Sequence, residues 1–204
     1  MNTKITRYFP AALVIFHVIG FVLFTQSDSA SDLTWLNLML CGTLVFLAES
    51  NLKKAALVFS IIAVGGFLIE LIGTKTGFLF GEYAYGEVLG WKLFGVSLII
   101  GVNWFAIVLA ASNVARLVKA PIVIQALLAG LFCVVLDFAI EPVAIKYGFW
   151  KWLGGEIPIF NYITWFGFAV LFAYIYVKNS RVVNKTAIWL FGIWLLFFIA
   201  LNFI

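Results

Sequence analysis

The sequence predicts an all-α, polytopic membrane helix bundle with about seven transmembrane helices and a cytoplasmic N-terminus. Three observations lead to this fold class. Hydrophobic residues make up 65% of the 204 residues and charged residues only 11%, whereas soluble domains carry about a quarter charged residues. Seven apolar segments approach the length of about 20 residues that a helix needs to cross a bilayer. Basic residues gather in alternate connections between these segments.

The seven predicted spans are dominated by apolar residues. They cover residues 8–25, 33–50, 54–73, 93–113, 121–140, 159–177 and 186–204. The first span looks like a signal peptide, but its apolar run is long and Asp28 stands where a cleavage site wants a small residue. We therefore expect it to be retained. No change of composition marks a second domain, so residues 1–204 are expected to form a single transmembrane domain.

Basic residues predict how the chain is oriented in the membrane. They precede the first span and follow the second, fourth and sixth spans: Lys4, Arg7, Lys53, Lys54, Arg116, Lys119, Lys178, Arg181 and Lys185. Because basic connections stay in the cytoplasm, we expect a multi-pass protein of the cell (inner or plasma) membrane. The two longest connections, 74–92 and 141–158, then lie on the outer face, where we expect the functional site. The net charge of +4 has this topological explanation and predicts no nucleic-acid partner.

Three acidic residues lie close to these outer loops. At a rise of about 1.5 Å per residue, Glu70 and Asp137 are both about 25 Å from the cytoplasmic end of their spans, in a core about 30 Å thick. Glu141 follows Asp137 by about one turn on the same helix face, and Pro142 is expected to end the helix. Charges at that depth are costly, so the three acids are expected to face the bundle interior. Salt bridges to loop lysines are the alternative for each acid alone.

The outer loops are rich in aromatic residues: Phe78, Phe80, Tyr83 and Tyr85 in the first, and Tyr147, Phe149, Trp150 and Trp152 in the second. Aromatic side chains are common at membrane boundaries, but ring faces around an acid can also stabilise a cation. The helix starts VSLIIGVNWF and IPIFNYITWF are weakly alike. This likeness suggests a distant parallel repeat of spans three–four and five–six.

Other polar residues in the spans are interpreted as structural. His17, the single histidine, is expected to form a hydrogen bond between helices. Glu49 is expected to be a charge at the cytoplasmic boundary beside Lys53. Cys41 and Cys133 each lie in an apolar run, where cysteine behaves as a small hydrophobe, so no disulfide or metal site is predicted.

Common catalytic motifs do not occur in the sequence. There is no GxSxG, GxxxxGK[ST], HExxH or CxxC, and a single histidine excludes a histidine-rich diiron enzyme. Residues 186–204 contain no lysine for a retinal Schiff base. Carboxylic acids, tyrosines, asparagines and aromatic walls are left, and this set suits cofactor-free proton chemistry on a lipid-dissolved substrate.

The spacing of residues around both outer loops is distinctive. The first reads Glu70-x-x-Gly73-x-x-Thr76-Gly77-x-x-Phe80-Gly81-x-Tyr83-x-Tyr85, and the second has Asp137, Glu141-Pro142, Gly148-Phe149-Trp150-x-Trp152, Ile157-Pro158, Asn161 and Trp165. Over roughly residues 65–170 the chain resembles the integral-membrane carotenoid 1,2-hydratase family, of the γ-carotene 1'-hydratase and bacterioruberin-pathway hydratase types. It departs from that pattern at Leu79 and Ser97, where proline is common, and at Glu141, where aspartate is common.

The resemblance implies a lyase of carotenoid biosynthesis that adds water across the terminal C=C bond of an acyclic carotenoid end group. Such a hydro-lyase would work by acid–base catalysis without a cofactor. Its partners would be the carotenoid, water and the lipid bilayer, and association with other carotenoid-pathway enzymes stays open. An alkene is a feeble base, so its protonation needs a strong acid that an apolar site keeps neutral until it reacts.

The candidate catalytic residues are Glu70, Asp137 and Glu141. Asp137 or Glu70 is expected to protonate the alkene. A second carboxylate is expected to activate water, and Glu141 is the candidate for this role. The sequence does not assign acid and base individually. The candidate substrate-binding residues are Thr76, Phe80, Tyr83, Tyr85, Trp150, Trp152, Asn161 and Trp165.

Other functions fit the same residues. A lycopene-type carotenoid cyclase also protonates a terminal alkene but excludes water, so that an internal double bond captures the cation. A non-enzymatic carotenoid-binding or assembly protein would use the loops as a partner surface. A transporter is a third alternative, although the uninterrupted spans show little sign of broken helices. The sequence leaves open which carotenoid reacts, whether one or both ends react, and the oligomeric state.

Overall fold

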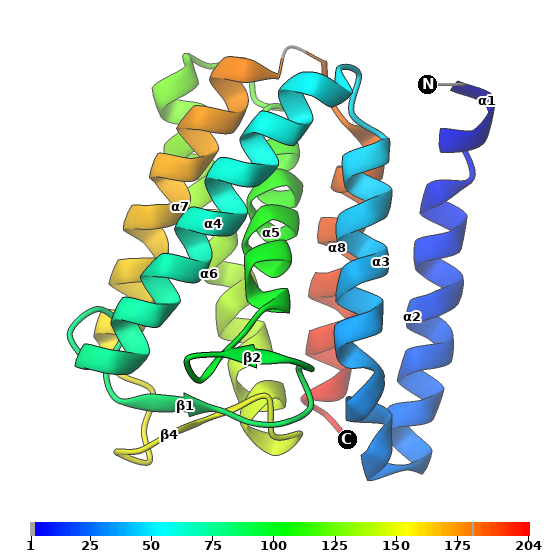
Figure 1. Cartoon of the computed structure of the whole chain (residues 1–204). Coiled ribbons are helices and arrows are strands. Elements are labelled where there is room, and N and C mark those ends of the chain that lie inside the picture. The colour runs from blue at the N-terminus through cyan, green and yellow to red at the C-terminus, as the bar shows by residue number, and fades with distance from the viewer. Residues whose placement is uncertain (1–2, 181) are drawn as a thin grey trace.

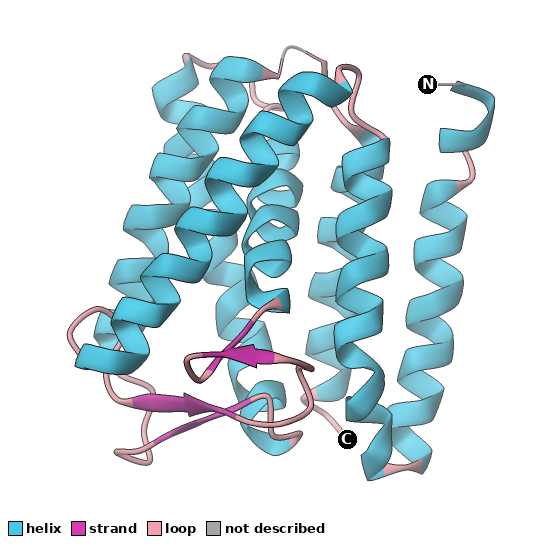
Figure 2. Cartoon of the chain, in the orientation of Figure 1, coloured by secondary structure: helices cyan, strands magenta, loops and turns pink. Residues whose placement is uncertain are grey.

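The computed structural model describes residues 3–180 and 182–204, which form a bundle of long helices with short strands at one end (Figure 1). In chain order the elements are α1 (Thr3–Thr6), α2 (Phe9–Gln26), the 3₁₀ helix η1 (Asp28–Leu33), α3 (Thr34–Leu47), α4 (Leu52–Thr76), β1 (Tyr83–Tyr85), β2 (Lys92–Leu93), β3 (Val96–Ser97), α5 (Ile99–Ala115), α6 (Ile122–Lys146), β4 (Trp150–Trp152), α7 (Ile159–Asn179) and α8 (Lys185–Leu201). Figure 2 shows how far helix predominates. The predicted all-α helix bundle is confirmed.

The long helices make this a multi-pass membrane protein. Among the described residues, five helical segments are long and apolar enough to cross a bilayer: Phe9–Gln26, Ser29–Leu47, Leu52–Thr76, Ile122–Lys146 and Ile159–Asn179. The other two predicted spans form the shorter apolar helices α5 and α8. The N-terminal end of the chain lies at one end of the bundle, and the strands lie with the C-terminus at the other (Figure 1). Arg181 and the side chain of Lys4, two of the basic residues behind the predicted orientation, lie outside the described residues.

Pro142 does not end its helix, so that prediction is wrong. α6 continues through this proline to Lys146. Proline at position i removes the hydrogen bond to the carbonyl of residue i−4, and Pro142 is close enough to the end of α6 for the remaining bonds to hold the last turn. α4 also runs past its predicted end. It stops where Gly77 adopts a left-handed φ of 66°, a conformation that glycine takes at little cost.

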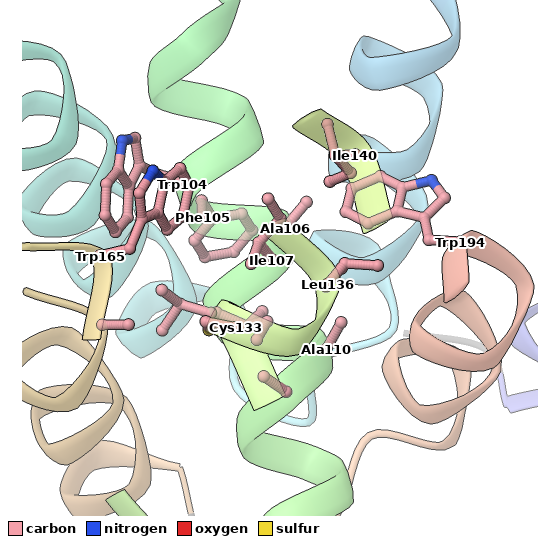
Figure 3. Close-up of a cluster of buried hydrophobic side chains, with 14 of the residues drawn as sticks. Trp104, Phe105, Ala106, Ile107, Ala110, Cys133, Leu136, Ile140, Trp165 and Trp194 are labelled. Carbon is pink, nitrogen blue, oxygen red and sulfur yellow. The ribbon is translucent and has the colours of Figure 1, made fainter. Parts of the chain in front are cut away.

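α5 is the central helix of the bundle, and residues 104–111 are all buried. Small residues let its neighbour α4 approach closely, as is common between membrane helices. A Cβ atom at Gly66 would lie 2.6 Å from the ring of Trp104, and one at Gly101 would lie 2.6 Å from the carbonyl oxygen of Ala63. Figure 3 shows the cluster of side chains that packs around α5.

The strands join the two long loops at one end of the bundle. β1 pairs with β4 in antiparallel register, with Tyr83 opposite Trp152 and Tyr85 opposite Trp150. The backbone approach next to this pair is tight, because a Cβ atom at Gly86 would lie 1.8 Å from the carbonyl oxygen of Gly148. The pairing places two tyrosines and two tryptophans over the ends of α4 and α6.

Glu49, which we expected to be a charge at the cytoplasmic boundary, is buried and hydrogen-bonded inside the bundle. Its side chain is 7% exposed. It accepts hydrogen bonds from the Tyr176 hydroxyl at 2.8 Å, the Asn184 amide at 2.8 Å and the Ser180 hydroxyl at 3.2 Å. These donors replace the water that a buried carboxylate loses, so Glu49 ties α3 to α7 and α8.

Candidate active site

Three carboxylates from two helices line one small cavity at the strand end of the bundle. Glu70 comes from α4, and Asp137 and Glu141 come from α6; they are 4%, 2% and 1% exposed. The cavity has a volume of about 30 Å³. The other residues that line it are Phe80, Tyr83, Tyr85, Ile100, Asn103, Ile107, Ile140, Trp150, Trp152, Asn161 and Trp165. The three acids selected from the sequence thus face a common space.

Glu70 accepts hydrogen bonds from three aromatic side chains. The hydroxyls of Tyr83 and Tyr85 donate to one carboxylate oxygen, the second at 2.6 Å, and Trp104 Nε1 donates to the other oxygen at 2.9 Å. Burial, followed by the neighbouring Glu70, raises the pKa of Tyr83 and of Tyr85 well above the ordinary tyrosine value. Both tyrosines therefore keep the proton that they donate.

Glu141 accepts hydrogen bonds from the second loop. Trp150 Nε1 and Trp152 Nε1 donate to its Oε2 atom at 3.0 and 2.9 Å, and Asn161 Nδ2 donates to its Oε1 atom at 3.1 Å. An indole N–H can only donate, so Glu141 is the acceptor in both hydrogen bonds. Hydrogen bonds of this kind stabilise the ionised form of a carboxyl group.

Asp137 has fewer donors than its two neighbours. Among the described residues, the hydrogen bond that the structure shows for its side chain comes from Asn161 Nδ2, at 2.9 Å to Oδ2. The apolar residues Ile140 and Ile107 line the same cavity. Of the three acids, Asp137 therefore receives the least support for a negative charge.

The site is built from two similar halves. β1 supplies the tyrosine pair that bonds to Glu70 on α4, and β4 supplies the tryptophan pair that bonds to Glu141 on α6. Trp104 and Trp165, which occupy matching positions in the two similar helix starts, stack with ring centroids 3.8 Å apart and an interplanar angle of 10°. Figure 3 shows these two rings face to face. This arrangement is consistent with the suggested repeat of spans three–four and five–six.

The structure places most predicted substrate-binding residues on this cavity: Phe80, Tyr83, Tyr85, Trp150, Trp152, Asn161 and Trp165 line it. It does not bring Thr76 there. The Thr76 side chain is exposed, its hydroxyl donates to the carbonyl oxygen of Ile72 at 2.7 Å, and it accepts from the N–H of Phe78 at 3.2 Å. These bonds fit a role in closing the end of α4.

Two residues that bring polar groups to the site, Trp104 and Asn103, are absent from the sequence-based selection, as are the isoleucines of the cavity wall. Trp104 bonds to Glu70, and Asn103 lines the cavity with an amide for which the structure shows no hydrogen bond to a described residue. Both belong to the NWF segment that matches TWF in the next pair of spans. The likeness between the two segments was the signal that could have indicated these residues. A single tryptophan in an apolar helix is not such a signal, because it is typical of a packed core.

Comparison with known proteins defines the class. The chain belongs to the carotenoid biosynthesis protein family, whose model matches residues 33–204. Over 122 residues it is 33% identical to the bisanhydrobacterioruberin hydratase of Haloarcula japonica, a match that covers 57% of this chain and 41% of that protein. The aligned region is therefore less than half of the relative. No solved structure matches the chain. The family suggested by the two loop motifs is confirmed.

Proposed function

We propose that the protein is a carotenoid hydratase that adds water across the terminal C=C bond of an acyclic carotenoid end group. The observation that carries this proposal is the cavity in which Glu70, Asp137 and Glu141 meet beneath aromatic rings. A member of a carotenoid biosynthesis family with this set of groups has what alkene protonation requires: a buried acid, a second carboxylate and walls that tolerate a cation.

Asp137 is the proposed proton donor. Its carboxyl group transfers a proton to the CH carbon of the terminal isopropylidene group; the π bond breaks, a C–H bond forms and a tertiary cation is left on the dimethyl carbon. Asp137 suits this step because it accepts a hydrogen bond from Asn161, whereas Glu70 and Glu141 each accept three. Hydrogen-bond donors stabilise the ionised form of an acid, so the acid with the fewest donors is the one most easily kept protonated.

The cation is held between ring faces and a fixed negative charge. Tyr83, Tyr85, Trp150 and Trp152 line the cavity, and aromatic faces attract cations. Glu70 lines it too. In this proposal Glu70 acts as the carboxylate, because its three donors favour a negative charge and fix the position of the side chain. Charge that is arranged before the reaction stabilises a developing cation without further reorganisation.

Water completes the reaction at Glu141. The carboxylate accepts a proton from a water molecule while the water oxygen attacks the cation, so that a C–O bond forms and a tertiary alcohol results. Passage of that proton to Asp137 restores the starting state, and the net reaction consumes one water. A cavity of about 30 Å³ has room for water, since one molecule needs about 10–15 Å³. Asn103 lines the same space, and its amide is the proposed group that orients the water.

The test is to express the chain in cells that make lycopene or γ-carotene and to measure the mass of the extracted pigments. A new pigment heavier by one water, absent when Asp137→Asn is expressed at the same membrane level, supports the hydratase. Unchanged mass with altered retention and absorption spectrum supports the cyclase instead. If neither substrate yields a new pigment and both proteins retain equal amounts of bound carotenoid, a non-enzymatic binding protein is supported.

A further inference from the structure

A second and much larger cavity lies beside the carboxylate site. It has a volume of about 400 Å³ and runs between α2, α3 and α8. Its walls are mainly apolar and come from α2, η1, α3, α8 and Phe149. We refer to this cavity as the α2 groove. The proposed chemistry does not use it.

A small cavity of about 30 Å³, which we call the connecting cavity, lies between the α2 groove and the carboxylates. The connecting cavity shares walls with the groove, namely Thr34, Leu38, Phe149, Trp194 and Phe198. It shares other walls with the carboxylate cavity, namely Ile100, Asn103, Ile140 and Trp150. Figure 3 shows Ile140 and Trp194 facing each other at this place. The three cavities therefore adjoin one another through shared wall residues.

The outer side of the α2 groove faces the bilayer. Phe16, Ile19 and Leu23 lie along it on α2 and are 50%, 50% and 37% exposed. Figure 1 shows α2 at the edge of the bundle beside α3. A molecule dissolved in lipid can enter the groove from the side without passing through water.

Three polar side chains line the groove, and two of them, His17 and Asn37, bond to other protein groups. His17 Nδ1 lies 2.7 Å from the carbonyl oxygen of Leu13, and its Nε2 atom lies 3.4 Å from Asn37 Nδ2. The predicted role of His17 as a hydrogen bonder between helices agrees with this contact. The third, Thr34, has a hydroxyl for which the structure shows no hydrogen bond to a described residue. Apart from that hydroxyl, the groove presents a mainly apolar surface to an occupant.

We infer that the α2 groove binds the polyene chain of the substrate and guides its end group to Glu70, Asp137 and Glu141. This inference rests on the proposed function for the identity of the occupant. A long apolar chain with one reactive end matches an apolar groove that narrows toward acids. The segment from Phe16 to Phe24 is about 12 Å long at the helical rise, so the groove holds part of the polyene and the rest lies in lipid.

The position of α2 gives this inference a consequence for specificity. α2 lies before residue 33, where the match to the family model begins. The groove is therefore formed partly by a helix outside the matched region, while the carboxylates lie inside it. In this inference α2 helps to select the shape of the part of the polyene next to the end group, and residues of α4 to α7 carry out the chemistry.

Gly20 offers a way to fill the groove without disturbing a packed contact. A Cβ atom there would lie 3.7 Å from the Phe197 ring, an ordinary van der Waals distance, so the larger side chain of Gly20→Leu projects into the cavity. Gly167→Leu is the matched control, because Gly167 is an exposed glycine of α7 with no neighbour within 4 Å of its Cβ position. Leu38→Trp narrows the connection itself.

The experiment is a titration of the full chain in lipid nanodiscs with lycopene, and binding is measured by the quenching of tryptophan fluorescence. Each substitution is combined with Asp137→Asn, which prevents turnover. Gly20→Leu should raise the Kd for lycopene at least tenfold, and Gly167→Leu should leave it unchanged. Without Asp137→Asn, Leu38→Trp should lower turnover at least tenfold while lycopene still binds, since the end group no longer reaches the acids.

The possible outcomes separate this inference from the proposed function. If the wild-type chain hydrates lycopene and Gly20→Leu binds it like the control, the route through the groove is wrong and the hydratase stands. If nothing is hydrated but Gly20→Leu still weakens binding, the groove stands and the proposed function fails. If Gly20→Leu is no longer quenched by a brominated phospholipid and its Kd for lycopene is unchanged, the groove is assigned to a lipid chain. Conversion of a dimer to a monomer by Gly20→Leu would assign it to a second copy; both results overturn the inference.

Discussion

Asp137 and Glu141 accept hydrogen bonds from one and the same side-chain amide, that of Asn161, at 2.9 and 3.1 Å. They lie about one turn apart on α6 and face one cavity. Two carboxyl groups that share a site are hard to ionise together, so one proton shared by the pair is the arrangement that the account expects at rest. In the proposed mechanism, that proton is the one delivered to the alkene.

Replacing Asp137 by asparagine should abolish hydration and leave the protein in the membrane. The substitution keeps the shape of the side chain and removes the acidic proton, and loss of a general acid costs about 10²–10⁴-fold in rate. Pigment analysis and membrane immunoblotting measure the two effects. Glu156→Gln, at an exposed loop residue, is the control and should react like the wild type. Full turnover by Asp137→Asn would remove Asp137 from the mechanism.

Replacing Asn161 by alanine should lower turnover about 10- to 100-fold. Its amide bridges the two acids of α6, and a hydrogen bond to a charged group is worth about 1.5–3 kcal/mol. Initial rates in isolated membranes measure the effect. Asn179→Ala provides the comparison, because Asn179 ends the same helix and bonds to the Ile175 carbonyl oxygen. Equal rates for the two variants would mean that the bridge is only structural.

The tyrosine pair predicts a loss of stability at high pH. The pKa values of Tyr83 and Tyr85 are raised in the folded protein, first by burial and then by Glu70. Unfolded tyrosine ionises near pH 10. The two tyrosines therefore make their full contribution to the free energy of unfolding below about pH 10. This contribution is lost as the pH rises from there toward the pKa of the folded state. Thermal unfolding in detergent between about pH 8 and 11 measures this loss, which should be smaller in the double variant Tyr83→Phe/Tyr85→Phe. An equal slope in both proteins would contradict it.

Adding a methyl group to Gly86 should loosen the pairing of β1 with β4. Its Cβ atom would lie 1.8 Å from the Gly148 carbonyl oxygen, and overpacking of this kind costs about 1–3 kcal/mol. The midpoint of thermal unfolding should fall in Gly86→Ala, and turnover should fall with it, since the strands position the aromatic donors of Glu70 and Glu141. Gly154→Ala, where a Cβ atom meets nothing within 4 Å, should behave as the wild type. Identical midpoints would show that the backbone moves aside freely.

The helices were predictable because each is an apolar run close to the thickness of a bilayer. Their ends were less so. The rule that proline stops a helix failed at Pro142, since a proline in the last turns costs few hydrogen bonds. Glu49 was misjudged for a related reason: its donors come from Tyr176, Ser180 and Asn184, far along the chain. No local pattern announces such partners.

The carboxylates were predictable from their depth, because charge inside an apolar helix is rare and costly. The separate roles proposed for the three acids were not predictable from the sequence. These roles depend on which donors reach each acid, and these donors are set by the pairing of β1 with β4 and by the stacking of Trp104 on Trp165. The α2 groove was also beyond reach of the sequence, since an exposed apolar face is what any membrane helix shows.

The source of the oxygen in the product tests the central claim most directly. Membranes containing the full chain would be incubated with lycopene in water labelled with ¹⁸O, and the pigment mass would be compared with that from ordinary water. Hydration through a carbocation should give a product heavier than lycopene by one labelled water, with the label in a tertiary hydroxyl group. A product of unchanged mass, or one whose oxygen carries no label, would contradict hydration through a carbocation in this cavity.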